Sequence, residues 1–128
     1  MGKYGNAAVV AATNNNRILS PSQAWISAIN SFTTSQTSRN KTCPKYAYLG
    51  LCETGLVMGI PSGNYGVPAN NPNKIYAVNA VSLLKNTPNI NVNTRGLKST
   101  LWASVGGEKH QNGQMDVVLS LWNAGLII

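Results

Sequence analysis

The 128-residue chain contains little charge and very few acidic residues. Asp and Glu together number three, there is one His, and charged residues make up 10% of the chain, against about 25% in an average soluble domain. General acid–base catalysis needs carboxylates or imidazoles held close to a substrate. Because so few are present, we predict a binding protein rather than an enzyme.

Cysteine is also scarce, since Cys43 and Cys52 are the only two. Nine residues apart on one predicted helix, they point to different faces and lie too far apart for a disulfide. Two thiols and one imidazole make a poor zinc site. No glycine-rich phosphate loop of the Walker or Rossmann type occurs. We therefore predict no metal, no cofactor and a reducing cytoplasm as the compartment.

Long hydrophobic runs are missing as well. No segment approaches the roughly 20 apolar residues of a membrane-spanning helix. The first residues, Met1, Gly2, Lys3 and Tyr4, do not begin a signal peptide. We predict a soluble protein with no membrane partner.

The residues that are present favour helices. Ser20 and Gln23 form a capping box around Pro21, which suits the first helical position. The apolar stripe that follows at helical spacing consists of Trp25, Ala28, Ile29 and Phe32. The spacing predicts a helix from Pro21 to about Phe32.

Similar signals predict the other helices. A largely apolar helix should run from about Cys43 to Glu53, with Gly55 as its left-handed cap. We expect another helix around residues 6–13, one opened by Pro72, one between Thr94 and residues 106–107, and a last one that stops at Gly125. Residues 61–73, rich in Gly, Pro and Asn, should form a loop.

The two halves of the chain resemble each other. Residues 49–57 match residues 119–127 in their apolar and polar positions and in the capping glycine, and residues 25–28 match residues 102–105. A unit of about 55 residues is marginal alone, because so short a chain buries too little of its surface. We therefore predict a single all-α domain of about six helices, in which two pseudo-symmetric three-helix units, residues 3–60 and 74–128, share one core.

Basic residues dominate the charge, because ten Lys and Arg against three acids give a net charge of +7. Residues 38–45 contain Arg39, Lys41 and Lys45 and no acid, and they lead into the amino end of a predicted helix, which favours anions. The repeat places Lys109 opposite Arg39, and Tyr65 in the loop has a ring that can stack on a base. We predict that these five residues bind nucleic acid or another phosphate-bearing ligand. A merely solvated basic loop is the simpler alternative.

Two other functions fit the same residues. A basic surface would also suit a protein-interaction module, or an inhibitor from a mobile element, whose partner is an acidic protein. A thiol enzyme would use Cys43, which lies at a helix amino end between two lysines, where a thiol pKa is lowered. It would need His110 beside it as a base. Cys52, in the apolar helix, should be an inert buried thiol.

Several short motifs resemble a family of small bacterial proteins of unknown function. They include Cys43-Pro44-Lys45, the run Leu49-Gly50-Leu51-Cys52-Glu53, Gly63-Asn64-Tyr65 and the late segment of residues 114–118. The resemblance extends over most of the chain. It implies no activity, and this chain has fewer charged residues than the pattern leads one to expect.

Overall fold

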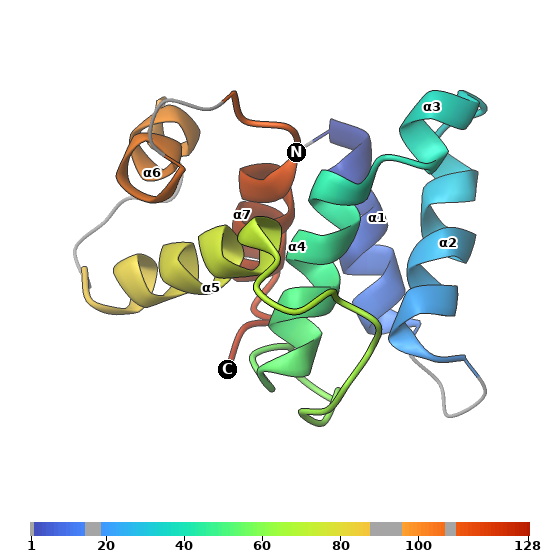
Figure 1. The fold of residues 1–128 in the computed structure, drawn as a ribbon, viewed down its shortest axis with the longest axis horizontal. Coiled ribbons are helices and arrows are strands. Elements are labelled where there is room, and N and C mark those ends of the chain that lie inside the picture. The colour runs from blue at the N-terminus through green and yellow to red at the C-terminus, as the bar shows by residue number, and fades with distance from the viewer. Residues whose placement is uncertain (1, 15–18, 88–95, 107–109) are drawn as a thin grey trace.

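The computed structural model describes residues 2–14, 19–87, 96–106 and 110–128 and shows an all-α protein (Figure 1). The helices are α1 (Gly2–Thr13), α2 (Pro21–Phe32), α3 (Gln36–Arg39), α4 (Thr42–Glu53), α5 (Pro72–Lys85), α6 (Leu97–Val105) and α7 (Gln114–Asn123). The described residues contain no β-strand, only one isolated bridge between Val57 and Ile127. The predicted fold class is confirmed.

Helix α2 begins where the capping box predicts. The Ser20 hydroxyl accepts a hydrogen bond from the Gln23 N–H at 3.2 Å, and the Gln23 side chain accepts one from the Ser20 N–H at 3.1 Å. Helix α5 begins in the same local way, because the Asn71 side chain accepts from the Asn73 N–H and Pro72 follows the cap. Both starts depend only on neighbouring residues.

Helices α4 and α7 end alike. Gly55 and Gly125 adopt φ values of +74° and +73°, a left-handed conformation that glycine adopts without steric cost. The N–H of Leu56 then donates to the Leu51 carbonyl at 3.1 Å, and the N–H of Leu126 donates to the Leu121 carbonyl at 3.0 Å. The glycine-capped ends that the sequence predicts are therefore present in both helices.

The structure differs from the sequence predictions in three places. Helix α1 begins at Gly2 rather than near Asn6. The short helix α3, capped by the Ser35 side chain, is not among the helices that the sequence predicts. Helix α6 starts after Gly96, while Thr94, the predicted cap, lies outside the described residues.

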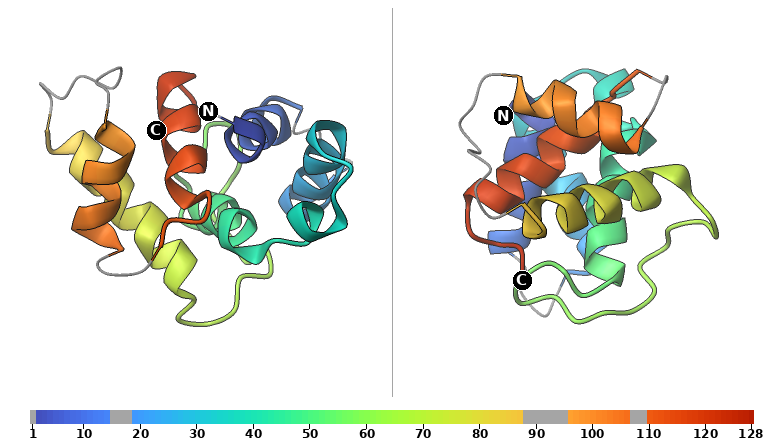
Figure 2. Two further views of the ribbon diagram at one scale, coloured as in Figure 1. Left: turned by 90° about the horizontal axis from the view of Figure 1, so that it is seen from above. Right: turned by 90° about the vertical axis from the view of Figure 1, so that its left-hand side faces the viewer.

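The helices are arranged so that α4 and α7 occupy the middle of the molecule (Figure 1). Helix α1 packs against both α2 and α7, while α5 packs against both α4 and α6. Seen from above, α2 and α6 form opposite ends of the molecule (Figure 2, left). The first helix of each predicted unit thus packs on the last helix of the other.

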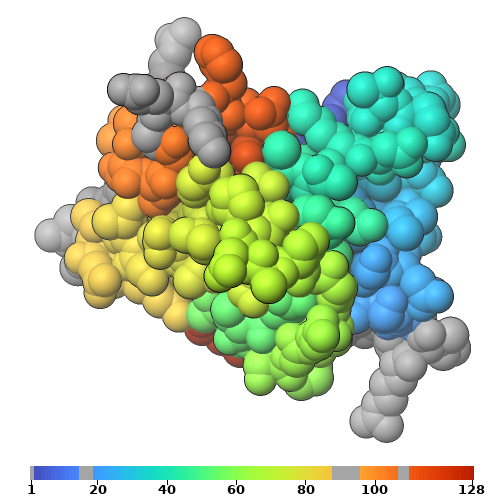
Figure 3. Space-filling view, in the orientation of Figure 1, coloured from blue at the N-terminus to red at the C-terminus, as the bar shows by residue number. Residues whose placement is uncertain are grey.

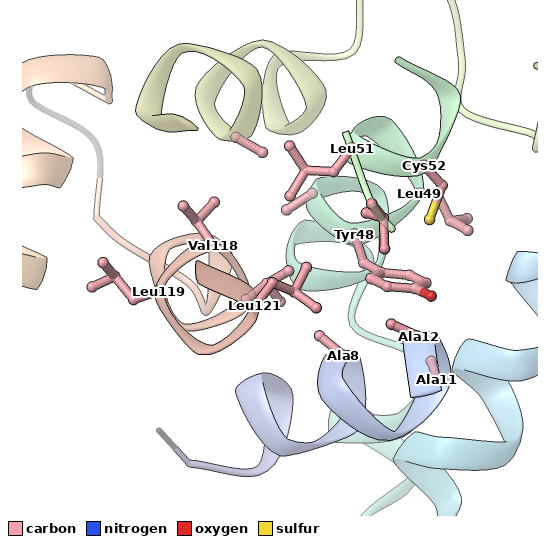
Figure 4. Close-up of a cluster of buried hydrophobic side chains, with 14 of the residues drawn as sticks. Ala8, Ala11, Ala12, Tyr48, Leu49, Leu51, Cys52, Val118, Leu119 and Leu121 are labelled. Atoms are coloured by element: carbon pink, nitrogen blue, oxygen red, sulfur yellow. The ribbon is translucent and has the colours of Figure 1, made fainter. Parts of the chain in front are cut away.

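The core lies where α1, α4 and α7 meet (Figure 4). Tyr48 is fully buried between α4 and the small residues of α1, and its ring stacks on Trp25 with 5.6 Å between centroids. The other labelled core side chains are Ala8, Ala11, Ala12, Leu49, Leu51, Cys52, Val118, Leu119 and Leu121. Most of the surface of α4 is buried, as its apolar sequence predicts.

Two hydrogen bonds join the ends of the predicted units reciprocally. The Met58 N–H donates to the Leu126 carbonyl at 2.8 Å, and the Ile128 N–H donates to the Leu56 carbonyl at 3.0 Å. Residues 56 and 58 are the repeat equivalents of residues 126 and 128, so each bond is the image of the other. This reciprocity is what a pseudo-two-fold axis requires, and the duplication itself stays a prediction.

None of the helices described has the length and apolar character needed to cross a membrane.

Candidate anion-binding site

The turn between α3 and α4 brings cations together. Arg39 is the last residue of α3, Lys41 immediately precedes α4, and Lys45 lies in its first turn. Lys3 of α1 joins them, because its Nζ donates to the Ser38 hydroxyl at 2.8 Å. We call Lys3, Arg39, Lys41 and Lys45 the basic corner. Three of its members are residues that the sequence singled out.

Two nitrogens of the Arg39 guanidinium donate hydrogen bonds within the protein. Its Nε donates to the Thr33 carbonyl at 2.8 Å, and Nη2 donates to the Asn30 carbonyl at 3.3 Å. These carbonyls belong to the carboxyl end of α2, where a cation is electrostatically favoured. Arg39 therefore fixes the turn against α2 and leaves fewer of its five donors for a ligand.

Arg39 and Lys45 also line an open cavity of about 280 Å³ between α2 and the start of α4. The other lining residues are Ile26, Asn30, Gln36, Asn40 and Thr42. None of them is acidic. The cavity can therefore receive an anion without charge repulsion.

The ring of Tyr4 holds the two remaining lysines near each other. Lys3 Nζ lies 5.3 Å and Lys41 Nζ 5.8 Å from the ring centroid, within the range of cation–π attraction. Two like charges on one ring repel each other, and an anion placed between them would relieve that repulsion.

The acids that the structure describes are engaged elsewhere. Glu53 accepts from Lys74 Nζ at 2.8 Å, and Asp116 accepts from Lys98 Nζ at 2.9 Å. Among the described residues, none of the basic-corner cations has an ion pair with a carboxylate. Their charge is therefore not neutralised within the described part of the protein.

The amino end of α4 adds to this field. In the part of the chain that the structure describes, no side-chain hydrogen bond caps it, and Pro44 has no N–H to donate. The first turn of an uncapped helix carries open N–H donors and the positive end of the helix dipole, which together favour a bound anion.

Tyr65 lies far from the basic corner. Its N–H donates to Glu53 Oε2 at 2.8 Å, and its hydroxyl donates to the Pro61 carbonyl. Glu53 ends α4, a helix of 12 residues and so about 18 Å long. Tyr65 therefore anchors the loop at the opposite end of α4. Lys109, the fifth predicted residue, lies outside the described residues.

Nothing in the sequence singles out Lys3 and Tyr4 as site residues. They are more than 30 residues from Ser38 and Lys41 along the chain, and only the packing of α1 beside α4 brings them close. The adjacency of Lys3 and Tyr4 in the sequence is their only local feature, and such pairs are too common to indicate a binding site.

A second cavity, of about 430 Å³, lies on the other side of the α4 amino end. Its lining residues are Cys43, Pro72, Asn73, Tyr76, Trp102, His110, Asn112 and Gln114, and we call it the amide pocket. The thiol and the imidazole that a thiol enzyme would need thus lie on the same cavity.

The two cysteines differ in their surroundings. Cys43 is half-buried and lines the amide pocket, whereas Cys52 is fully buried beside Tyr48. Burial raises the pKa of Cys52 to about 12. Cys52 is therefore an inert thiol. In the described part of the chain, no group of three His, Cys, Asp or Glu residues could hold a metal ion.

Comparison with known proteins found one match, to a family model. A family model described as a family of unknown function, DUF6979, matches residues 1–128. Neither a curated protein nor a solved structure matches the chain.

Proposed function

The chain belongs to this family of unknown function, and we propose that it binds the phosphate groups of nucleic acid, or of a smaller ligand, through the basic corner. One observation carries the proposal. Four cations from α1, α3 and α4 lie around an uncapped helix end, and none has an ion pair with a described acid.

Such a site would position a phosphate backbone without reading its sequence. Lys3 and Lys41 would contact one phosphate beside Tyr4, and Lys45 would contact another through the neighbouring cavity. Helix α4 is too deeply buried to enter a groove of DNA. Contacts to phosphate alone give affinity that varies little with base sequence.

Fluorescence anisotropy with labelled single- and double-stranded oligonucleotides, measured across a salt series, tests the proposal. We expect affinity in the micromolar range at low salt that falls log-linearly as salt rises. The double variant Lys41→Gln/Lys45→Gln should bind less tightly, with a salt slope lower by about 2, since each lost phosphate contact lowers it by about 1. Competition with pyrophosphate distinguishes a small phosphate ligand from a polymeric one.

The matched control is Lys85→Gln/Lys98→Gln, which removes the same charge from α5 and α6. Lys85 Nζ donates to the Ile128 carbonyl at 2.6 Å and Lys98 pairs with Asp116, so neither belongs to the basic corner. This control should keep most of the affinity. Equal losses in the two double variants would show that only net charge matters, and absence of binding at low salt would refute the proposal.

A further inference from the structure

The amide pocket contains a pair of buried amides whose orientations can be deduced. Asn73 is 8% exposed and Gln114 is 2% exposed. The Asn112 N–H donates to Gln114 Oε1 at 2.6 Å, which fixes the orientation of the Gln114 amide. Gln114 Nε2 then donates to Asn73 Oδ1 at 3.0 Å. The amide nitrogen of Asn73 is therefore the remaining donor.

No described residue accepts a hydrogen bond from Asn73 Nδ2. A donor in a residue so deeply buried is normally satisfied, and the little surface that Asn73 keeps lies on the cavity that it lines. Asn73 Nδ2 is not among the described side-chain atoms that are fully enclosed without a partner, so its free N–H bonds face the amide pocket and can donate to an acceptor bound there.

The walls of the pocket are suited to a flat apolar group. Tyr76 and Trp102 meet edge to face, with 5.0 Å between centroids and 79° between planes, and Pro72 also lines the cavity. The volume lies within the usual range for small-molecule sites, about 300–1,000 Å³. In Figure 3, the segments that line it meet on the face shown, where the start of α5, the start of α4 and the residues before α7 come together.

The charge around the pocket favours an anion. Cys43, Asn73 and Gln114 lie in the first turns of α4, α5 and α7, so the positive ends of three helix dipoles meet here. His110 also lines the cavity, and none of the described residues that line it is acidic. One free amide donor in largely apolar surroundings fits a carboxylate better than the more heavily hydrated phosphate.

We propose that the amide pocket binds a small carboxylate with a planar, apolar body. A carboxylate oxygen would accept from Asn73 Nδ2, and the flat body would pack against Tyr76 and Trp102. Among the described residues, this site shares no lining residue with the cavity of the basic corner. Carboxylate binding in the amide pocket can therefore be tested independently of phosphate binding at the basic corner.

Cys43 offers a built-in probe for the test, because it lines the pocket while Cys52 is fully buried and unreactive in the native protein. Alkylation by iodoacetamide should therefore report on Cys43 alone. We expect 2-naphthoate to slow this reaction severalfold and to give saturation-transfer NMR signals. The matched neutral compound, 2-naphthamide, should bind at least tenfold more weakly.

The decisive variant is Asn73→Asp. It keeps the oxygen that accepts from Gln114 Nε2 but replaces the free donor with a second, charged oxygen. An acid in the first turn of α5 is favoured by the helix dipole, so the variant should fold. We expect at least a tenfold loss of 2-naphthoate affinity, whereas Asn79→Asp, on an exposed position of the same helix outside the pocket, should bind normally.

Three results would overturn the proposal. These are unchanged binding in Asn73→Asp, equal binding of 2-naphthoate and 2-naphthamide, or no protection of Cys43 by either compound. Circular dichroism establishes whether Asn73→Asp folds. If it does not, Tyr76→Leu removes one aromatic wall instead, and unchanged binding of 2-naphthoate in that variant would equally count against the site.

Discussion

Glu53 organises the loop that connects the two halves of the chain. Its side chain is 7% exposed, and its oxygens accept from the N–H groups of Tyr65 and Val67 at 2.8 and 3.1 Å and from Lys74 Nζ at 2.8 Å. Burial acts to raise the pKa of Glu53, but these three hydrogen bonds outweigh it and hold the pKa below the ordinary value of 4.5.

We predict that Glu53→Gln lowers the free energy of unfolding at pH 7 by about 1–3 kcal/mol, the usual value of hydrogen bonds to a buried charge. A depressed pKa stabilises the fold above the unfolded-state pKa, and this contribution disappears as the pH falls through the folded-state pKa. The difference between wild type and variant should thus shrink below about pH 4.5, as urea unfolding at a series of pH values would reveal.

Asp116→Asn is the control, because Asp116 pairs with a lysine side chain that is 45% exposed. Surface ion pairs contribute about 0–1 kcal/mol, so this variant should remain near wild type at every pH. A Glu53→Gln difference that persists unchanged at pH 3 would contradict the assigned role of the carboxylate.

At this scale, the sequence predicts which cations lie together in the candidate site only in part. Arg39, Lys41 and Lys45 are close in sequence, so their proximity in space follows from chain connectivity. The capping of α2 by Arg39, the approach of Lys3 and the cavity shared by Cys43 and His110 depend on tertiary packing. None of these has a local signature.

At the scale of helices, local chemistry made most boundaries predictable. The capping box at Ser20, the proline at the start of α5 and the glycine after α4 each act on their immediate neighbours. Helix α3 has four residues, too few for apolar periodicity to appear. The first turn of α1 contains two glycines and no cap signal, and packing of Gly5 on α7 compensates for this.

Two glycines, one in α1 and one in α4, allow these helices to approach a neighbouring helix closely. A Cβ on Gly5 of α1 would lie 2.1 Å from Ser120 Oγ and 2.9 Å from the Asp116 carbonyl oxygen of α7. A Cβ on Gly50 of α4 would lie 2.8 Å from the Lys74 Cα of α5. Since backbone atoms are among these neighbours, side-chain rotation alone cannot make room for a methyl group.

We predict that Gly5→Ala and Gly50→Ala each destabilise the protein by about 1–3 kcal/mol, the usual range for overpacking. Helix propensity alone would predict the opposite effect on stability, because it favours Ala over Gly by about 1 kcal/mol. Thermal unfolding followed by circular dichroism gives the measurement. Asn6→Ala, at an exposed position of α1, should be neutral or slightly stabilising, and stabilisation in the glycine variants would contradict the close packing.

At the scale of the whole molecule, the two predicted units interleave. Helix α1 packs on α7 and α4 packs on α5, so each unit buries its apolar faces against the other. Apolar periodicity shows which face of a helix is buried but not which helix covers it. The reciprocal bonds at Met58 and Ile128 close this arrangement.

This interleaving predicts how the chain behaves when it is divided between Gly63 and Asn64, at an exposed loop tip. Fragments 1–63 and 64–128 should each lack cooperative unfolding, because a chain of about 60 residues is marginal alone and because α7 and α5, which pack on α1 and α4, lie in the other fragment. Mixed in equal amounts, they should regain the helical circular dichroism of the intact chain.

The same experiment can show that reassociation uses the native contacts. A 1–63 fragment that carries Gly5→Ala should bind 64–128 more weakly, because the α1–α7 contact forms only on association. A 1–63 fragment that unfolds cooperatively by itself would mean that the first unit has a sufficient core of its own. The two halves would then be separate domains in contact, and the shared core would not be what holds the fold together.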